Sequence, residues 1–266
     1  MANKIHLLII DPQFDFCDPT GALFVRGADQ DTIRLAQMVD RLRGKIDDIH
    51  VTLDSHHEVD CAHPIFWINS KGEHPAPFTI ITRQDVANGV WTPTSPALRQ
   101  RMLDYVTALE QNQRYPLCIW PPHCIIGSKG HQIMPDLSDA LRRWSRERFK
   151  TVDYVTKGSN PFTEHYSAVK ADVPDPADPT TMLNTQLITT LQEADTILIS
   201  GQALSHCVAN TIRDVAAEFG DANVKKFVLL TDTCSNVPGF ENFGTKFVDD
   251  MTKLGMKKST AATYLL

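Results

Sequence analysis

The sequence offers a candidate nucleophile in the segment ISGQALSHCVANTIRD, where an apolar run ends at Ser200 and a helical pattern begins near Cys207. A thiol at the start of a helix lies at the positive end of the helix dipole, which lowers the thiol pKa and favours the thiolate. Backbone N–H groups of the same turn lack partners within the helix and can stabilise an oxyanion. A lone cysteine is more often a small buried side chain, so its neighbours must decide its role.

Two charged residues at the ends of other apolar runs supply the acid–base chemistry that a thiol nucleophile needs. Asp11 follows the run that ends at Ile10, and Lys157 follows the run Thr151–Val155. Asp11 can take the thiol proton and return it to a leaving amine, which typically contributes roughly 100- to 10,000-fold in rate. Lys157 can keep Asp11 charged and favour the thiolate. Together these residue types predict a cysteine hydrolase that acts on a small amide.

A second group of residues has the composition of a metal site. Asp54 and His56 are two residues apart after an apolar run, so in an extended chain both side chains point the same way. The segment WPPHC adds His123, and one carboxylate with two imidazoles suits Zn, Fe or Mn; we favour Zn. His63 is a further candidate, either as a fourth ligand or as a neighbour of the ligands, and His57 should face away. Three histidines without an evident partner are expected to be ordinary loop residues: His74, His131 and His165.

These residues must be positioned by an alternation of short apolar runs and helical patterns. The expected strands are His6–Ile10, Ile49–Leu53, Thr151–Val155, Thr196–Ser200, Lys226–Leu230 and, more weakly, Ala261–Leu265. The expected helices span about 30–44, 136–148, 206–219 and 240–254. Continuous apolar runs are typical of strands buried on both faces, and the alternation predicts a doubly wound α/β fold with a mostly parallel sheet. Ligands bind at the carboxyl ends of such strands, where the candidate residues should meet.

Residues 60–100 interrupt this alternation with a stretch rich in proline, aromatic and turn residues. Long irregular segments of this kind are usually functional loops or insertions. The following stretch SPALRQRMLDYVTALEQNQ predicts a helix that starts at Ser95 or Pro96. We therefore expect one hydrolase domain, residues 1–266, with an elaborated insertion at about 60–115.

Composition argues against several other classes of protein. The 266 residues carry a formal net charge of −6 without a long basic run, which disfavours a nucleic-acid partner. The basic residues of 142–150 are interleaved with aromatic ones and should form the solvated face of a helix. No membrane span or signal peptide is expected. The six cysteines include no C-x-x-C pair, which indicates reduced thiols and a cytoplasmic location. The sequence leaves open whether the chain forms a homo-oligomer.

Five stretches, taken together and in order, resemble the nicotinamidases of the isochorismatase-like cysteine hydrolase family. They are LLIIDPQFDFCDPTGAL, VTLDSHH, WPPHCIIGSKGHQIMP, VTKGSNPFTEHYSA and SGQALSHCVANTIRDVA, and they span nearly the whole chain. The resemblance implies a six-stranded parallel sheet with helices on both faces. It also implies a catalytic triad of Asp11, Lys157 and Cys207. The metal ligands that it implies are Asp54, His56 and His123.

The resemblance further implies how a substrate is held and what happens to it. Phe16 and Trp120 would sandwich an aromatic ring, and a divalent metal would hold the pyridine nitrogen, directly or through water. Backbone N–H groups of Ala203 and Cys207 would form the oxyanion hole, beside a cis peptide bond between Gln202 and Ala203. The implied reaction is hydrolysis of nicotinamide to nicotinate and ammonia through a cysteine thioester, as in NAD salvage.

The sequence departs from the family pattern at several positions. In the nucleophile turn, Gln202 and Leu204 replace the usual residues and predict an altered pocket floor, while Ser205 stands at a position that is usually acidic. Ser55 stands where a tryptophan is often found between the metal-binding Asp and His. These departures bear on the substrate more than on the type of reaction.

Three alternatives compete with this interpretation. The first is a related amidohydrolase acting on another small carboxamide, although the metal set favours nicotinamide. The second is a non-haem iron oxygenase with a facial triad, which would leave Cys207 and Lys157 without roles. The third is an inactive binding protein on the same fold, against which the complete set of Asp, Lys and Cys speaks. A nucleotide-binding enzyme is disfavoured because the sequence has neither G-x-G-x-x-G after the first strand nor a P-loop.

Overall fold

The computed structural model describes residues 3–112 and 115–266, and a six-stranded parallel sheet forms their centre. Its strands are β1 (Ile5–Ile10), β2 (Asp48–Asp54), β7 (Asp153–Lys157), β8 (Thr196–Gly201), β9 (Phe227–Leu230) and β10 (Lys257–Ser259). They lie in the order β10-β9-β8-β1-β2-β7, and every neighbouring pair is parallel. From β1 the chain adds β2 and β7 on one side, and then crosses to add β8, β9 and β10 on the other. The predicted doubly wound α/β fold is therefore confirmed.

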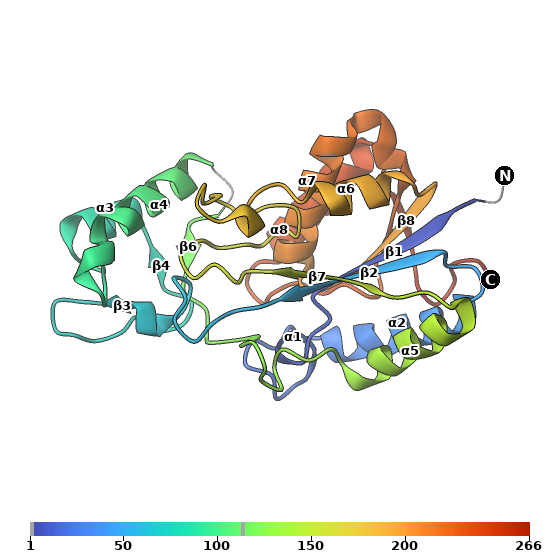
Figure 1. The fold of residues 1–266 in the computed structure, drawn as a ribbon, viewed down its shortest axis with the longest axis horizontal. Coiled ribbons are helices and arrows are strands. Elements are labelled where there is room, and N and C mark those ends of the chain that lie inside the picture. The colour runs from blue at the N-terminus through green and yellow to red at the C-terminus, as the bar shows by residue number, and fades with distance from the viewer. Residues whose placement is uncertain (1–2, 113–114) are drawn as a thin grey trace.

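Helices cover both faces of the sheet (Figure 1). One face carries α2 (Ala28–Leu42) and α5 (Pro135–Arg148); the other carries α6 (Thr185–Gln192), α7 (Ala209–Phe219) and α8 (Glu241–Lys253). Strand β1 is buried along its whole length and its side chains alternate between two cores. Leu7 and Ile9 pack with residues of α2 and α5, whereas Leu8 and Ile10 pack with residues of α7 and α8. A central strand with apolar side chains on both faces explains the continuous apolar run in the sequence.

The two edge strands lie away from their predicted positions. Strand β7 begins at Asp153 rather than Thr151, and its side chains alternate between partly buried and exposed positions. The last strand is Lys257–Ser259, and the predicted strand Ala261–Leu265 is wrong because those residues form turns. An edge strand is half solvated, so the apolar signal used to place it is weak. Helix α6 was not predicted at all, although Asn184 caps its first turn by accepting from the Leu187 N–H at 3.0 Å.

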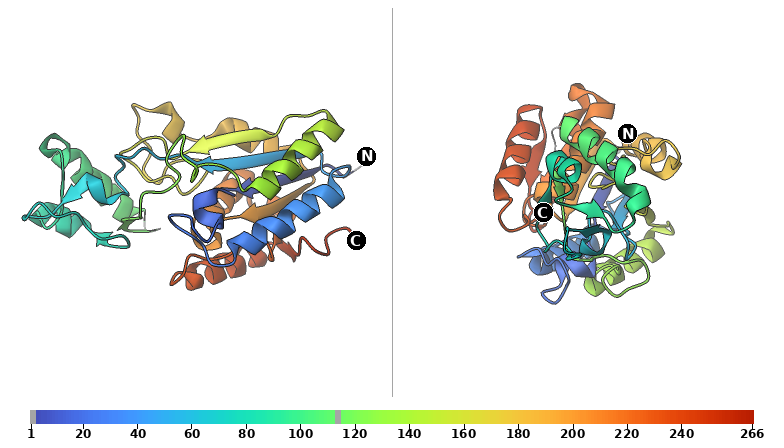
Figure 2. Two further views of the ribbon diagram at one scale, coloured as in Figure 1. Left: turned by 90° about the horizontal axis from the view of Figure 1, so that it is seen from below. Right: turned by 90° about the vertical axis from the view of Figure 1, so that its left-hand side faces the viewer.

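The segment between β2 and α5 forms a lobe at one end of the molecule, and Figure 2 shows it extending beyond the sheet. It contains η1 (Pro64–Phe66), β3 (Trp67–Ile68), β4 (Ile80–Ile81), α3 (Arg83–Asn88), β5 (Thr92–Pro93), η2 (Pro96–Leu98), α4 (Arg99–Gln111) and β6 (Leu117–Cys118). We call residues 60–112 and 115–118 the lobe. Its apolar side chains, including Trp67 and Met102, form a cluster separate from the two cores on the sheet. Gln113, the end of the predicted helix, lies outside the described residues.

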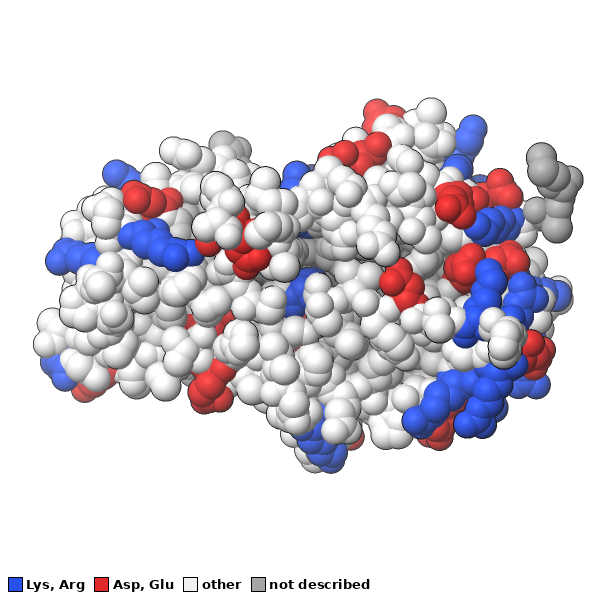
Figure 3. Space-filling model, viewed as in Figure 1, with Lys and Arg blue, Asp and Glu red and all other residues white. Residues whose placement is uncertain are grey.

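The basic residues near the end of α5 are solvated and paired with acidic neighbours. Arg143 binds both carboxylate oxygens of Asp40, at 2.7 and 2.6 Å, and Lys150 contacts Asp48 at 2.8 Å. Figure 3 shows acidic groups set among the Lys and Arg side chains of this region. The predicted solvated helix face is therefore confirmed. Among the described residues, the helices are too short or too polar to cross a membrane.

Candidate active site

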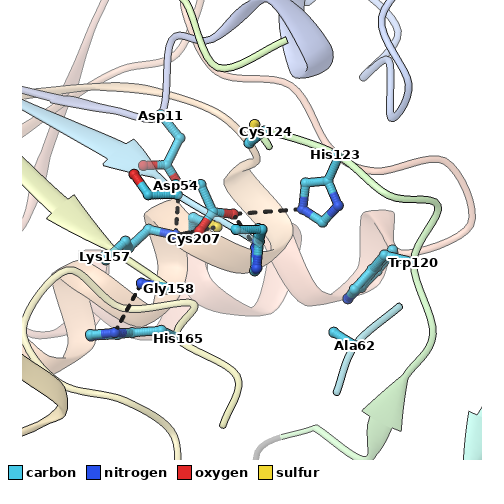
Figure 4. A network of polar contacts seen from close by, with 12 residues as sticks. Asp11, Asp54, Ala62, Trp120, His123, Cys124, Lys157, Gly158, His165 and Cys207 are labelled. Carbon is cyan, nitrogen blue, oxygen red and sulfur yellow. Dashed lines mark hydrogen bonds and ion pairs between the residues drawn. The ribbon is translucent and has the colours of Figure 1, made fainter. Parts of the chain in front are cut away.

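The carboxyl ends of four neighbouring strands bring the predicted catalytic residues together around the Lys157 ammonium group (Figure 4). Its Nζ atom lies 2.9 Å from Asp11 Oδ2, 3.0 Å from Asp54 Oδ1 and 3.7 Å from Cys207 Sγ. All four side chains are buried. Strand pairing explains part of this convergence, because Asp54 and Lys157 are direct partners at the ends of β2 and β7.

Two buried polar side chains on neighbouring segments fix the carboxylates in place. The Asp11 N–H donates to the backbone oxygen and the hydroxyl of Thr52, and that hydroxyl donates in turn to Asp11 Oδ1. Gln13 clamps the backbone of Asp54: its Nε2 donates to the Asp54 carbonyl and its Oε1 accepts from the Asp54 N–H, both at 2.7 Å. The short segment α1 (Phe14–Cys17) follows directly. The carboxylates are thus held by the backbone of the strands as well as by Lys157.

The predicted nucleophile, Cys207, lies in the tight turn between β8 and α7. The peptide bond between Gln202 and Ala203 is cis, as predicted, and Cys207 lies within a π-helical turn, η4 (Leu204–Val208), that leads into α7. The N–H groups of His206 and Val208 both donate to the Ala203 carbonyl. The positions of Ala203 and Cys207 are compatible with the predicted oxyanion hole, which stays a prediction.

Gln202 and Leu204, which depart from the family pattern, lie outside the lining of the cavity beside Cys207. Gln202 donates to Asp31 at 2.9 Å and accepts from the Ser235 N–H at 3.1 Å. Neither Gln202 nor Leu204 lines the cavity beside Cys207, so the prediction of an altered pocket floor is wrong. Ser205 contacts His206 Nδ1 at 2.9 Å and accepts from the Val237 N–H, so it orders the turn without a charge.

The protonation of the site is set by burial and by the ammonium group. Burial raises the pKa of the Cys207 thiol well above its usual value, and Lys157 opposes this only in part. The predicted thiolate-favouring effect of the helix start is therefore outweighed. Burial also raises the pKa of Asp11. For Asp54, Lys157 and His56 outweigh burial and hold the pKa well below its usual value. Cys207 consequently rests as a neutral thiol, which would need a base to act as a nucleophile.

The three predicted metal ligands form one compact buried group. Asp54 Oδ2 lies 3.3 Å from His56 Nε2 and 3.6 Å from His123 Nε2. The three ligand atoms lie within 4.8 Å of one another. Asp60 Oδ2 contacts His56 Nδ1 at 3.0 Å, and the Pro121 carbonyl contacts His123 Nδ1 at 2.9 Å. Each ring is therefore oriented by its outer nitrogen and presents the other to Asp54, as is usual for metal-binding histidines. This donor set fits one divalent metal ion.

Two further histidines lie close to the metal ligands in the sequence, His57 and His63. The His63 ring lies 5.2 Å from that of His56 and 5.5 Å from that of His123, but it is not part of the compact group of ligand atoms. Its Nε2 is buried without a hydrogen-bond partner among the described residues. His57 is exposed and faces away, as predicted.

The three loop histidines lie in irregular segments, as predicted, and each has a hydrogen-bond partner. The hydrogen bonds are His131 Nε2 with Ser55 Oγ at 2.8 Å, His165 Nδ1 with the Gly158 N–H at 3.2 Å, and His74 Nδ1 with the Trp67 carbonyl at 2.7 Å. His165 is also buried directly behind Lys157, where Figure 4 shows it beside Gly158.

A small cavity, partly open to solvent, leads to Cys207. Its walls are Phe16, Leu23, Val25, Asp54, Trp120, His123, Glu164, Tyr166, Ala203, His206, Cys207 and Val237. Phe16 and Trp120, predicted from the resemblance to hold a substrate, both line it. Three polar or aromatic residues of the wall were missed in the sequence: Glu164, Tyr166 and His206.

The missed residues order the aromatic wall. The indole N–H of Trp120 donates to Glu164 Oε2 at 3.2 Å and to the Tyr166 hydroxyl at 3.1 Å. The His206 ring stacks on Tyr115 with centroids 5.0 Å apart. Burial raises the pKa of Glu164 to about 8 and lowers the pKa of His206 to about 4, so both side chains are largely neutral at pH 7. Aromatic and apolar side chains form most of the cavity wall, with the Asp54 carboxylate among them, and this lining suits a small aromatic ligand.

The chain has the α/β fold of solved nicotinamidases and pyrazinamidases. The nicotinamidase of Acinetobacter baumannii matches with a TM-score of 0.66 and 20% identity over 99% of both chains. The yeast nicotinamidase bound to the inhibitor nicotinaldehyde matches with a TM-score of 0.66 and 19% identity, over 96% of this chain and 99% of its own. The pyrazinamidase of Pyrococcus horikoshii in complex with zinc matches with a TM-score of 0.58 and 18% identity, over 97% of this chain and 99% of its own. No protein-family model and no curated protein matches by sequence.

Proposed function

We propose that this chain is a cysteine-dependent amidohydrolase that converts nicotinamide to nicotinate and ammonia. The observation that carries the proposal is the contact of one buried ammonium group with a thiol, an acid and a metal-binding carboxylate, at the base of an aromatic cavity. The fold of solved nicotinamidases supports the same class of reaction. The role of the reaction in NAD salvage follows from the substrate.

The chain's own residues account for both halves of the reaction. Asp11 takes the proton from Cys207 Sγ as the sulfur attacks the amide carbonyl, and the oxyanion is received by the backbone N–H groups of Ala203 and Cys207. Asp11 then gives that proton to the departing ammonia, which leaves a thioester. A water molecule, deprotonated by Asp11, attacks the thioester and releases the acid and the thiol. Lys157 keeps both carboxylates in position and offsets their charge.

Substrate orientation follows from the cavity walls. Phe16 and Trp120 contact the two faces of the ring, and the Trp120 indole is kept in place by its bonds to Glu164 and Tyr166. Asp54 and the two neighbouring imidazoles would hold one divalent ion, for which the zinc complex of the Pyrococcus horikoshii pyrazinamidase makes zinc the first choice. When bound, such an ion supplies a Lewis acid for the ring nitrogen.

A second candidate is hydrolysis of another small carboxamide by the same residues. Several of the structurally similar proteins are named pyrazinamidases, and their ligand differs from nicotinamide by one ring nitrogen. The cavity walls of this chain accept either ring, because most of the lining is aromatic or apolar and Glu164 and His206 are largely neutral at pH 7.

Ammonia release from nicotinamide by metal-replete protein tests the proposal. Cys207→Ala should lower the rate by roughly 10,000-fold or more, as loss of a nucleophile does in other hydrolases. The matched control is Cys234→Ala, which removes another buried thiol that does not line the cavity and should leave the rate nearly unchanged. No release by the wild type would refute the nicotinamidase assignment. The same assay with pyrazinamide and with benzamide, which lacks the ring nitrogen, then separates a related amidase from a protein that hydrolyses no amide.

A further inference from the structure

The carboxylate of Asp54 lies between two positions for positive charge (Figure 4). Its Oδ2 faces the Nε2 atoms of His56 and His123, where the proposed metal would bind. Its Oδ1 faces the opposite way, toward Lys157 Nζ at 3.0 Å. One oxygen therefore serves the metal position and the other serves an ammonium group.

The ammonium position has a donor set of its own. Asp11, Asp54 and Cys207 each direct one ligand atom toward it, and the three atoms lie within 4.8 Å of one another. All three side chains are more than nine-tenths buried. Apart from the Lys157 ammonium, Asp11 Oδ2 and Asp54 Oδ1 have no hydrogen-bond partner among the described residues. Carboxylate oxygens and a thiolate are both ligand types that Zn²⁺ binds, and the three atoms are close enough together to hold one ion.

We infer that Lys157 occupies the second position of a latent two-metal centre, with Asp54 as the carboxylate that bridges both positions. Two-metal hydrolases hold their ions about 3.5–4 Å apart, a spacing that a single carboxylate can bridge. Two buried carboxylates require a positive charge nearby, and here the lysine supplies it from within the chain. Lys157 thereby limits the wild type to one ion, and its removal opens a site in which Cys207 binds metal as a thiolate.

Counting bound ions in Lys157→Ala tests this inference. Wild type and variant are loaded with Co²⁺ or Zn²⁺, freed of excess metal, and analysed for metal per chain. The wild type should hold one ion, without thiolate-to-cobalt charge transfer in the near ultraviolet. Lys157→Ala should hold two ions and show that absorption band. Adding Cys207→Ser to the variant should abolish the band, and adding Asp11→Asn should return the count to one.

Several other outcomes would overturn the inference of a second metal position. One ion in Lys157→Ala, a second ion without the thiolate band, or two ions in the wild type would each overturn the inference. If Lys157→Ala fails to fold without metal, refolding with Zn²⁺ should restore it, because the second ion replaces the missing positive charge. A variant that stays unfolded at saturating Zn²⁺ contradicts the inference. No readout involves a substrate, so these results are independent of the proposed amidase activity.

Discussion

Replacing Gly158 with alanine should damage the site through direct contact with Asp54. Gly158 follows β7 with φ +83°, and a Cβ atom there would lie 2.8 Å from Asp54 Oδ1 and 3.5 Å from His56 Cε1. Ordinary contact begins near 3.4 Å, so the carboxylate oxygen would have to move by about 0.6 Å. That oxygen is the one that contacts Lys157 at 3.0 Å, and Gln13 fixes the backbone behind it. The substitution therefore separates the acid from its cation or tilts it away from the metal position.

The expected effect has two parts. The left-handed backbone costs an alanine about 1–2 kcal/mol of stability wherever it occurs. Displacement of the carboxylate adds a local loss of roughly 10- to 100-fold in metal affinity, the size expected when the support of a ligand is disturbed. Misplacement of catalytic groups by about 1 Å can cost on the order of 100-fold in rate. Turnover should therefore fall by one to two orders of magnitude.

Gly72 provides the matched control. Its φ is +79°, nearly the same, and a Cβ atom there would meet nothing within 4 Å. Gly72→Ala and Gly158→Ala should lose similar stability in urea unfolding, but only Gly158→Ala should lose metal in competition with a chelator and turn over nicotinamide slowly. If both variants keep metal affinity and turnover within threefold of each other, the close approach of Gly158 to Asp54 does not constrain the site.

Three further predictions concern single side chains. Asp60→Ala should weaken metal binding by roughly 10- to 100-fold in a chelator competition, because His56 loses the partner that orients its ring. Burial raises the pKa of Glu164 from 4.5 in the unfolded chain to about 8 in the folded one. The free energy of unfolding of the wild type should therefore fall as the pH rises between these values, by up to about 1.4 kcal/mol per pH unit. Urea unfolding of Glu164→Gln over the same pH range should lack this decline. Arg143→Ala should cost less than about 1 kcal/mol, and high salt should remove the difference, because the Asp40 pair is partly exposed.

The sequence predicts the centre of the fold better than its margins. Strand β1 has apolar side chains on both faces, and its position was predicted to within a residue. Strands β7 and β10 form the edges, where solvent replaces one neighbour, and charged residues such as Lys257 and Lys258 occur in the strand itself. Apolar periodicity carries little information there, so one edge was misplaced by two residues and the other was assigned to the wrong segment.

The same contrast applies to the site. Asp11, Asp54 and Lys157 lie at strand ends, and the geometry of a parallel sheet brings strand ends together whatever the connecting loops do. Glu164 and Tyr166 come from an irregular segment whose path no periodic pattern reveals. Their only signal was their place a few residues after Lys157 in a stretch that resembles the family. The net pKa of a buried group is equally hidden, because it depends on how completely the folded chain excludes water.

Two segments of the chain connect the lobe to the sheet, the incoming stem (residues 55–59) and the outgoing stem (residues 119–126). They run side by side at the metal position. His56 lies on the incoming stem, and its N–H donates to the Cys124 carbonyl of the outgoing stem, while its carbonyl accepts from Ile126. His123 and Trp120 belong to that outgoing stem, and the backbone N–H of Trp120 donates to the carbonyl of Ala62 in the lobe. An ion held by the imidazoles of His56 and His123 would cross-link the two stems and close the chain between these residues into a loop. Two main-chain hydrogen bonds tie the stems to each other and a third ties the Trp120 backbone to the lobe, so a movement of the lobe would displace one aromatic wall of the cavity.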